Sequence, residues 1–122
     1  MIVREWITDC HDCAADLDDP AGIEAALRNG ALRVGATVLG ISTTRYQPVG
    51  LTVFLPLAES HLLVSTWPEY RFAIVGILLC NDTMDPGLAQ QLVLGHLRPA
   101  RVQLHKVEHR VEAPARAGEA GR

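Results

Sequence analysis

Hydrophobic and polar positions repeat along this chain with the two periods that distinguish strands from helices. The strand-like segments cover residues 2–10, 37–42, 51–57, 62–67, 71–79 and 101–111. The helix-like segments run from about Pro20 to Val34 and from Asp85-Pro86 to about Leu97. Strands that follow one another this closely are expected to pair antiparallel. The order therefore predicts an α+β fold, an antiparallel β-sheet with two helices packed on one face.

Local signals refine this picture. Asp18-Asp19-Pro20 supplies the acidic cap and early proline of a helix start, and Gly35 is expected to close the same helix. Gly30 weakens the interior of that helix, and Pro99 stops the second one. Residues 51–57 are too apolar for a strand with a solvated face, so we expect them to form a central strand.

The length of 122 residues indicates one domain, which we place at residues 1–111. Residues 112–122 are mostly small and charged, and we expect them to form a disordered tail. A chain this short buries one modest core. The strands of the meander are rich in Val, Ile and Leu and would leave apolar area exposed on the second sheet face of a monomer. We therefore expect a homodimer that forms through the sheet or its edges.

Charge and hydropathy exclude several classes of protein. Hydrophobic residues make up 48% of the chain, charged residues make up 20%, and the formal net charge is −3, which does not suit a nucleic-acid surface. The longest apolar stretches, residues 51–58 and 72–80, are about half of what a membrane-spanning helix needs. The first residues lack the features of a secretory signal, so we expect a cytoplasmic protein with no membrane partner.

The chain has three cysteines, an odd number that favours reduced thiols over a disulfide framework. Cys10 and Cys13 form a lone C-x-x-C pair. A zinc site would need two further ligands at a compatible spacing, and no second pair is present. We therefore expect no metal, and keep redox or metal chemistry at this pair as a minor alternative.

The most informative segment is Leu57-Ala58-Glu59-Ser60-His61-Leu62-Leu63-Val64-Ser65-Thr66-Trp67-Pro68-Glu69-Tyr70, followed ten residues later by Cys80. Composition alone indicates a turn between two strands, with Ser60 as an ordinary turn serine. The whole segment, however, closely resembles the prokaryotic S-adenosylmethionine decarboxylases, whose hallmark is A/S-E-S-H-L, a strand, H-T-W-P-E-Y and a cysteine at this distance. The resemblance covers about residues 3–110, and its motif is far more specific than a short glycine pattern.

The resemblance implies a proenzyme that cleaves itself between Glu59 and Ser60. In that family the serine hydroxyl attacks the preceding carbonyl, and the resulting ester eliminates to leave a pyruvoyl group, here derived from Ser60. This covalent cofactor, which needs no metal, condenses with the substrate amine and acts as an electron sink during decarboxylation. The implied reaction converts S-adenosylmethionine into the aminopropyl donor for spermidine and other polyamines.

The resemblance also assigns roles to four other side chains. Cys80 would return a proton to the substrate's α-carbon, although by itself it could equally be a buried core residue. Tyr46 and Trp67 would lie against the adenine ring, where the alternative is ordinary core filling. Glu69 would accept hydrogen bonds from the ribose hydroxyls, whereas in isolation it would be a solvated charge.

Several positions depart from the family pattern. Ser65 stands where the family has the histidine that removes the serine α-proton during cleavage, and serine is a poor base near neutral pH. His61 is itself a family residue, so it is not an obvious replacement. Thr52 stands at a serine position that assists processing, and its hydroxyl could do the same work. Arg71 and Gly76 replace a glycine and an aspartate and could reshape the pocket.

Three functions therefore stay open. The leading one is a self-processing S-adenosylmethionine decarboxylase. The second is a pyruvoyl-dependent decarboxylase of another amino acid such as ornithine or arginine, suggested by Arg71 and Gly76. The third is a non-processing paralogue that binds nucleosides or regulates a partner subunit, suggested by Ser65.

Overall fold

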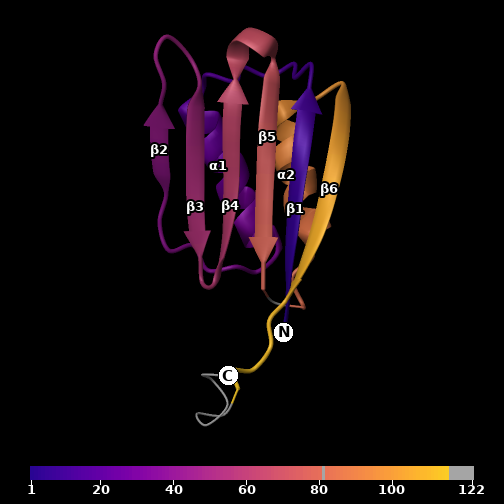
Figure 1. The fold of residues 1–122 in the computed structure, drawn as a ribbon. Coiled ribbons are helices and arrows are strands. Elements are labelled where there is room, and N and C mark those ends of the chain that lie inside the picture. The colour runs from indigo at the N-terminus through magenta and orange to yellow at the C-terminus, as the bar shows by residue number, and fades with distance from the viewer. Residues whose placement is uncertain (81, 116–122) are drawn as a thin grey trace.

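A computed structural model describes residues 1–80 and 82–115 and shows a six-stranded antiparallel sheet with the order β2-β3-β4-β5-β1-β6 (Figure 1). The strands are β1 (Ile2–His11), β2 (Ser42–Arg45), β3 (Leu51–Leu57), β4 (Ser60–Trp67), β5 (Phe72–Leu79) and β6 (Arg101–Arg110). The helices are α1 (Pro20–Arg33) and α2 (Pro86–Leu97), and a 3₁₀ turn, η1 (Pro68–Tyr70), joins β4 to β5. The predicted α+β class with an antiparallel sheet is confirmed.

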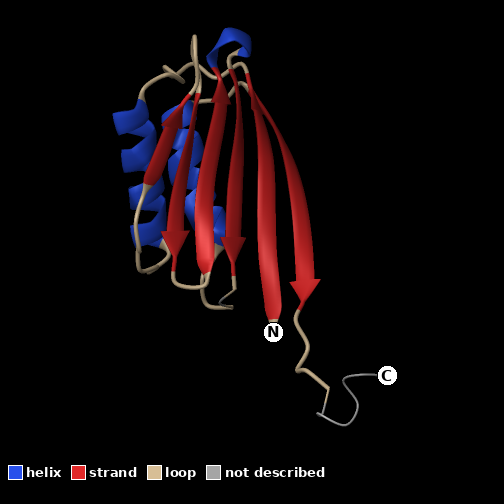
Figure 2. Ribbon diagram, turned by 60° about the vertical axis from the view of Figure 1, so that its left-hand side comes forward, coloured by secondary structure: helices blue, strands red, loops and turns tan. Residues whose placement is uncertain are grey.

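Both helices pack on the same side of the sheet, as Figure 2 shows. The core lies between these layers and consists of the inward-facing strand residues together with the apolar face of each helix. Both helices begin where the sequence predicts, because an aspartate accepts a hydrogen bond from a backbone N–H of the first turn and a proline follows it. Asp19 accepts from the Gly22 N–H at 3.3 Å, and Asp85 accepts from the Gly87 N–H at 2.8 Å.

Gly30 has a packing role that explains its place inside α1. A Cβ atom added there would stand 3.3 Å from the carbonyl oxygen of Ala89 on α2. The missing side chain therefore lets the two helices approach closely, and this contact offsets the loss of helix propensity.

The prediction of a strand over residues 37–42 is wrong. Only Val38 bridges to Leu57 in this segment, and the real edge strand, β2, begins at Ser42. Val38 and Ile41 are partly buried against the core. The segment touches β3 at this one bridge and does not form a ladder, so the apolar character of Val38 and Ile41 reflects mainly the packing of the chain between α1 and the sheet edge.

The expected burial of residues 51–57 on both faces is also wrong. Leu51, Val53, Leu55 and Leu57 are buried under the helices, whereas Phe54, on the opposite face, is 36% exposed. β3 pairs on both edges but lies next to the edge strand β2, so it is not central.

Within residues 1–80 and 82–115, no helix covers the second face of the sheet, called the open face below (Figure 2). Its apolar side chains are partly or fully exposed in the single chain, and they include Ile7, Phe54, Leu63, Phe72, Ile74 and Leu78. Among the residues that the structure describes, no helix is long and apolar enough to cross a membrane. The predicted tail over residues 112–122 is only partly described. Residues 112–115 are exposed and have no regular structure, and residues 116–122 lie outside the described part.

Candidate active site

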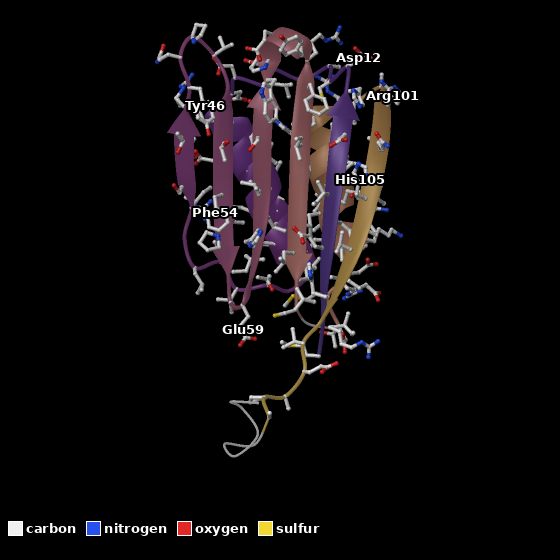
Figure 3. All side chains as sticks on the ribbon, in the orientation of Figure 1. Asp12, Tyr46, Phe54, Glu59, Arg101 and His105 are labelled. Carbon is white, nitrogen blue, oxygen red and sulfur yellow. The ribbon has the colours of Figure 1, made fainter. Side chains whose placement is uncertain are left out.

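The predicted site residues gather at two opposite ends of the sheet. Ser60 begins β4 and Trp67 ends it, so about 23 Å of extended strand separates them. Figure 3 shows this separation, with Glu59 at one end of the sheet and Tyr46 toward the other. We call Glu59, Ser60 and Cys80 the Ser60 end. The Trp67 end consists of Tyr46, Thr52, Ser65, Trp67 and Glu69.

At the Ser60 end, a tight hairpin brings a hydroxyl and a thiol together. Leu57 pairs with Ser60 across the β3–β4 turn, and Glu59 in that turn has a left-handed backbone with φ of 63°. Cys80 follows β5 directly, so it lies beside the start of β4.

The polar atoms at this end are within contact distance. The Ser60 Oγ is 3.5 Å from the Cys80 Sγ and accepts a hydrogen bond from the Cys80 backbone N–H at 3.3 Å. The Cys80 thiol points to the Glu59 Oε2 at 3.7 Å. Ser60 and Cys80 are both half-buried. The arrangement places a nucleophilic hydroxyl and a proton-bearing thiol side by side at an accessible turn.

His61 lies next to these residues in sequence but belongs to the open face. Its ring packs on Phe54, with 5.3 Å between ring centroids. The alternation of β4 puts residues 61, 63, 65 and 67 together on this face, while Leu62, Val64 and Thr66 are buried.

At the Trp67 end, side chains from four segments surround a cavity of about 290 Å³. The lining residues are Tyr46, Val49, Thr52, Ser65, Thr66, Trp67 and Glu69. Tyr46 is 50% exposed and Trp67 is 39% exposed, so two aromatic rings are accessible to a ligand. The volume is at the lower limit of typical small-molecule sites. All five residues of the Trp67 end, predicted separately, therefore share one pocket.

Three hydroxyl groups form a chain along the wall of this cavity. The Thr52 Oγ1 is 3.0 Å from the Ser65 Oγ, because Thr52 and Ser65 are register partners on β3 and β4. The Tyr46 hydroxyl is 3.0 Å from the same Thr52 Oγ1. Ser65 thus stands five strand residues, about 16 Å, from Ser60 in the same chain.

Val49 and Thr66 line the cavity but were not predicted from the sequence. Thr66 is buried, accepts the Leu51 N–H at 3.1 Å and donates to the Leu51 carbonyl at 3.4 Å. These two bonds hold the start of β3 against the end of β4. The T-W-P sequence was the only signal for Thr66, and Val49 carried none beyond its place in a turn.

Arg71 and Gly76 do not line this cavity within one chain. The Arg71 Nε donates to the Cys13 carbonyl at 3.2 Å, and the Cys13 N–H donates to the Arg71 carbonyl at 2.9 Å. Gly76 lies on the open face in mid-sheet, between Ile7 of β1 and Leu63 of β4. Arg71 therefore ties the η1 turn to the β1–α1 loop.

The C-x-x-C pair lies inside the core. Cys10 is fully buried, and Cys13 is 1% exposed. Burial, with smaller contributions from Cys13 and Asp9, raises the pKa of the Cys10 thiol to about 12. Burial also raises the pKa of Cys13, against the opposing effect of Arg71. Both shifts disfavour the thiolate that redox or metal chemistry needs.

Comparison with known proteins connects this arrangement to one family. The family model described as S-adenosylmethionine decarboxylase matches residues 4–110. The S-adenosylmethionine decarboxylase proenzyme of Thermosipho africanus (strain TCF52B) is 37% identical over 107 residues, which cover 87% of this chain and 81% of that protein. The proenzyme of Parasynechococcus marenigrum (strain WH8102) is 36% identical over 116 residues, or 94% of this chain and 89% of that protein. The crystal structure of the adenosylmethionine decarboxylase from Aquifex aeolicus superimposes with a TM-score of 0.80 at 25% identity, covering 94% of this chain and 97% of that one.

Proposed function

This chain belongs to the S-adenosylmethionine decarboxylase family, and on that premise we propose that it is a self-processing enzyme that decarboxylates S-adenosylmethionine. Its product would be the aminopropyl donor for spermidine and related polyamines. The observation that carries the proposal is the contact between the Ser60 hydroxyl and the Cys80 thiol at a hairpin turn. The resemblance requires a nucleophile and a proton donor at these two positions.

Self-processing follows from the chemistry of the Glu59–Ser60 bond. Attack of the Ser60 hydroxyl on the Glu59 carbonyl transfers the acyl group from nitrogen to oxygen and forms an ester. Removal of the Ser60 α-proton then breaks the ester and releases Glu59 as a carboxylate. The remaining enamine exchanges its nitrogen for a water oxygen, releasing ammonia. A pyruvoyl group then begins the second fragment.

The residues at the Ser60 end fit such a group. Ser60 is already at the start of β4, so cleavage leaves its carbonyl carbons beside Cys80. When formed, the pyruvoyl group supplies an electron sink for the electron pair that decarboxylation leaves on the substrate. Cys80 donates the proton that then completes the α-carbon. In the uncleaved chain the Glu59 Oε2 accepts a hydrogen bond from this thiol.

The Trp67 end binds the nucleoside part of the substrate. Tyr46 and Trp67 present accessible ring faces to adenine, and such stacks add about 0.5–1.5 kcal/mol beyond area burial. Glu69 lies on the cavity wall and accepts hydrogen bonds from the ribose hydroxyls.

A homodimer would bring the two ends together. Within one chain the ends are too far apart, at about 23 Å, for one substrate to reach both. The open face is apolar and uncovered, which favours a second copy as its cover. A two-fold axis lying between two facing sheets and across the strands would set the Ser60 end of one copy opposite the Trp67 end of the other. Two equivalent composite sites would result.

The three cysteines are free thiols, which suits the reducing cytoplasm that we propose as the enzyme's location.

Ser65 supports a second candidate, a paralogue that stays uncleaved. The Ser65 hydroxyl is hydrogen-bonded to Thr52, and a serine hydroxyl is a poor base near neutral pH. The elimination step therefore lacks the base that the family's histidine provides. Ester formation needs only a positioned hydroxyl, so the elimination step should limit processing.

Intact mass spectrometry tests the proposed function. We expect wild-type protein to contain uncleaved 13.3 kDa chain together with two fragments that divide between Glu59 and Ser60. Hydroxylamine, which attacks esters, should increase cleavage. In the proposed homodimer the Trp67 end of one copy lies opposite the Ser60 end of the other, so Ser65→His would act on the second copy's Ser60 and should raise the conversion rate by about a hundredfold or more. Ser60→Ala is the uncleavable control. A wild-type chain that never cleaves, even in hydroxylamine, would support the non-processing paralogue.

A further inference from the structure

The turn that carries Tyr46 and Val49 into the cavity has few anchors of its own. It joins β2 to β3, and β2 is a four-residue edge strand whose side chains are largely exposed. Within the turn, the Tyr46 N–H donates to the Gly50 carbonyl at 2.8 Å. Gly50 is buried and has φ of 106°, and an added Cβ would stand 3.1 Å from the Thr66 carbonyl oxygen. The turn therefore sits tightly on the end of β4 at Gly50.

A carboxylate from a distant loop reaches this turn. The Asp18 Oδ1 accepts a hydrogen bond from the Gly50 N–H at 3.1 Å, and the Asp18 Oδ2 is 3.5 Å from the Arg45 guanidinium. These two contacts lie on either side of Tyr46 in the sequence. The bond from Gly50 is charge-assisted and satisfies a buried backbone donor.

Asp18 itself is held in place by its neighbours. Leu17 is buried in the core at 3% exposure, and Asp19 caps the first turn of α1. The Asp18 N–H donates to the Asp16 Oδ1 at 2.9 Å. Leu17, Asp18 and Asp19 each have a contact that holds the loop, and this places the Asp18 side chain beside the turn.

We propose that Asp18 is a positioning residue for substrate binding, whose carboxylate sets where Tyr46 and Val49 stand relative to Trp67. The effect acts through the Gly50 N–H and reaches the cavity by the Tyr46–Gly50 hydrogen bond. Since the cavity is the site assigned to the nucleoside, this inference rests on the proposed function. Asp18 does not line the cavity and acts only through the turn.

The test compares Asp18→Ala, Asp18→Asn and the wild type in steady-state kinetics with S-adenosylmethionine. Asp18→Ala should raise KM about tenfold and change kcat by less than about threefold, because a displaced pocket wall weakens binding without moving Ser60 or Cys80. Asp18→Asn keeps an acceptor for the Gly50 N–H, so its KM should lie close to that of the wild type. Self-cleavage should proceed at the wild-type rate in both variants.

Asp19→Ala is the matched control. It removes a carboxylate from the adjacent residue and should lower thermal stability through the lost helix cap, with KM unchanged. A rise in KM in Asp19→Ala equal to that in Asp18→Ala would overturn the proposal, because it would show a general loosening of the loop.

Amide hydrogen exchange at Gly50 gives a readout that does not depend on activity. The exchange rate should rise at least about tenfold in Asp18→Ala and stay near the wild-type value in Asp19→Ala. An unchanged rate, or an unchanged KM in an active enzyme, would overturn the positioning role. If the wild type neither decarboxylates S-adenosylmethionine nor binds adenosine, the proposed function fails separately, and the Gly50 exchange still decides whether Asp18 holds the turn.

Discussion

The two ends of β4 differ in how their chemistry is assembled. At the Ser60 end, Glu59 and Ser60 are neighbours in sequence, and a single hairpin and one strand end bring Cys80 to them. At the Trp67 end, residues of the β2–β3 turn, β3, β4 and η1 line the cavity. Asp18, in the loop between β1 and α1, hydrogen-bonds to that turn. The Ser60 end is thus built from local sequence, whereas the Trp67 end depends on tertiary contacts.

This difference has a functional meaning. Bond-making and bond-breaking groups must hold a fixed mutual geometry, which a tight turn secures with few residues. A nucleoside presents a large, mixed surface, and several segments must converge to bind it. The ends lie about 23 Å apart in one chain, which is why we propose that a second copy joins them into one site.

The largest expected effect comes from separating the two ends into different chains. Ser60→Ala and Trp67→Leu should each remove most activity as homodimers. Heterodimers of these two variants, purified with two different tags, contain one complete composite site and should show about half of the wild-type activity per dimer. Cleavage of the Trp67→Leu chain is first checked by intact mass.

The converse heterodimer is the control for that experiment. A chain with both substitutions, paired with the wild type, leaves every composite site with one damaged end and should be inactive. Half activity in this heterodimer, with none in the first, would show that each site lies within a single chain. A monomer in sedimentation at micromolar concentration would also contradict the composite site.

The next largest effect concerns the thiol of the Ser60 end. Cys80→Ala, in processed enzyme, should lower turnover by about a hundred- to ten-thousand-fold, because it removes the group that we propose protonates the α-carbon. Thermal stability should stay close to that of the wild type, since Cys80 is only half-buried. Rapid-quench product analysis distinguishes slow protonation from loss of binding. Full activity with the normal product would remove Cys80 from this role.

A smaller effect is expected for the carboxylate of the Trp67 end. Glu69→Gln should weaken binding of an uncharged adenosine analogue about tenfold, because a neutral amide accepts hydrogen bonds less strongly than a carboxylate. Self-cleavage should be unaffected. Titration calorimetry gives the affinity, and Tyr70→Phe, a change in the same η1 turn outside the cavity, is the control. Equal affinities for Glu69→Gln and wild type would favour a different substrate.

The smallest effect concerns the buried thiol of Cys10 on β1. The Cys10 pKa is about 12 in the folded protein against 9.0 for an unperturbed thiol. Between these values the unfolded chain loses a proton that the folded chain keeps, so the free energy of unfolding falls as pH rises. The slope from Cys10 is at most about 1.4 kcal/mol per pH unit. Urea denaturation from pH 8 to 11 should show a shallower slope for Cys10→Ala than for the wild type, and equal slopes would contradict the shift.

Most of the secondary structure could be predicted from the sequence, because caps, prolines and period-two patterns act over a few residues. Asp19 and Asp85 start their helices as predicted, and the meander from β3 to β5 follows its pattern closely. The failures are at Val38 and Ile41, where apolar residues pack on the core in a segment that makes one isolated bridge and no strand, and at Phe54, which faces away from the core. An apolar residue is expected to be shielded from water, but its hydrophobicity does not predict which part of the protein shields it.

The sequence by itself determined the family and the residues that share a face of β4, because these depend on motif order and on a period of two. Only the tertiary structure decided how those residues divide between two ends of the sheet. It also decided that Asp18, an apparent helix cap, bonds to Gly50 instead, some thirty residues further along the chain. Such contacts depend on how the loop and the edge strand dock onto the core, and local sequence patterns do not contain that information.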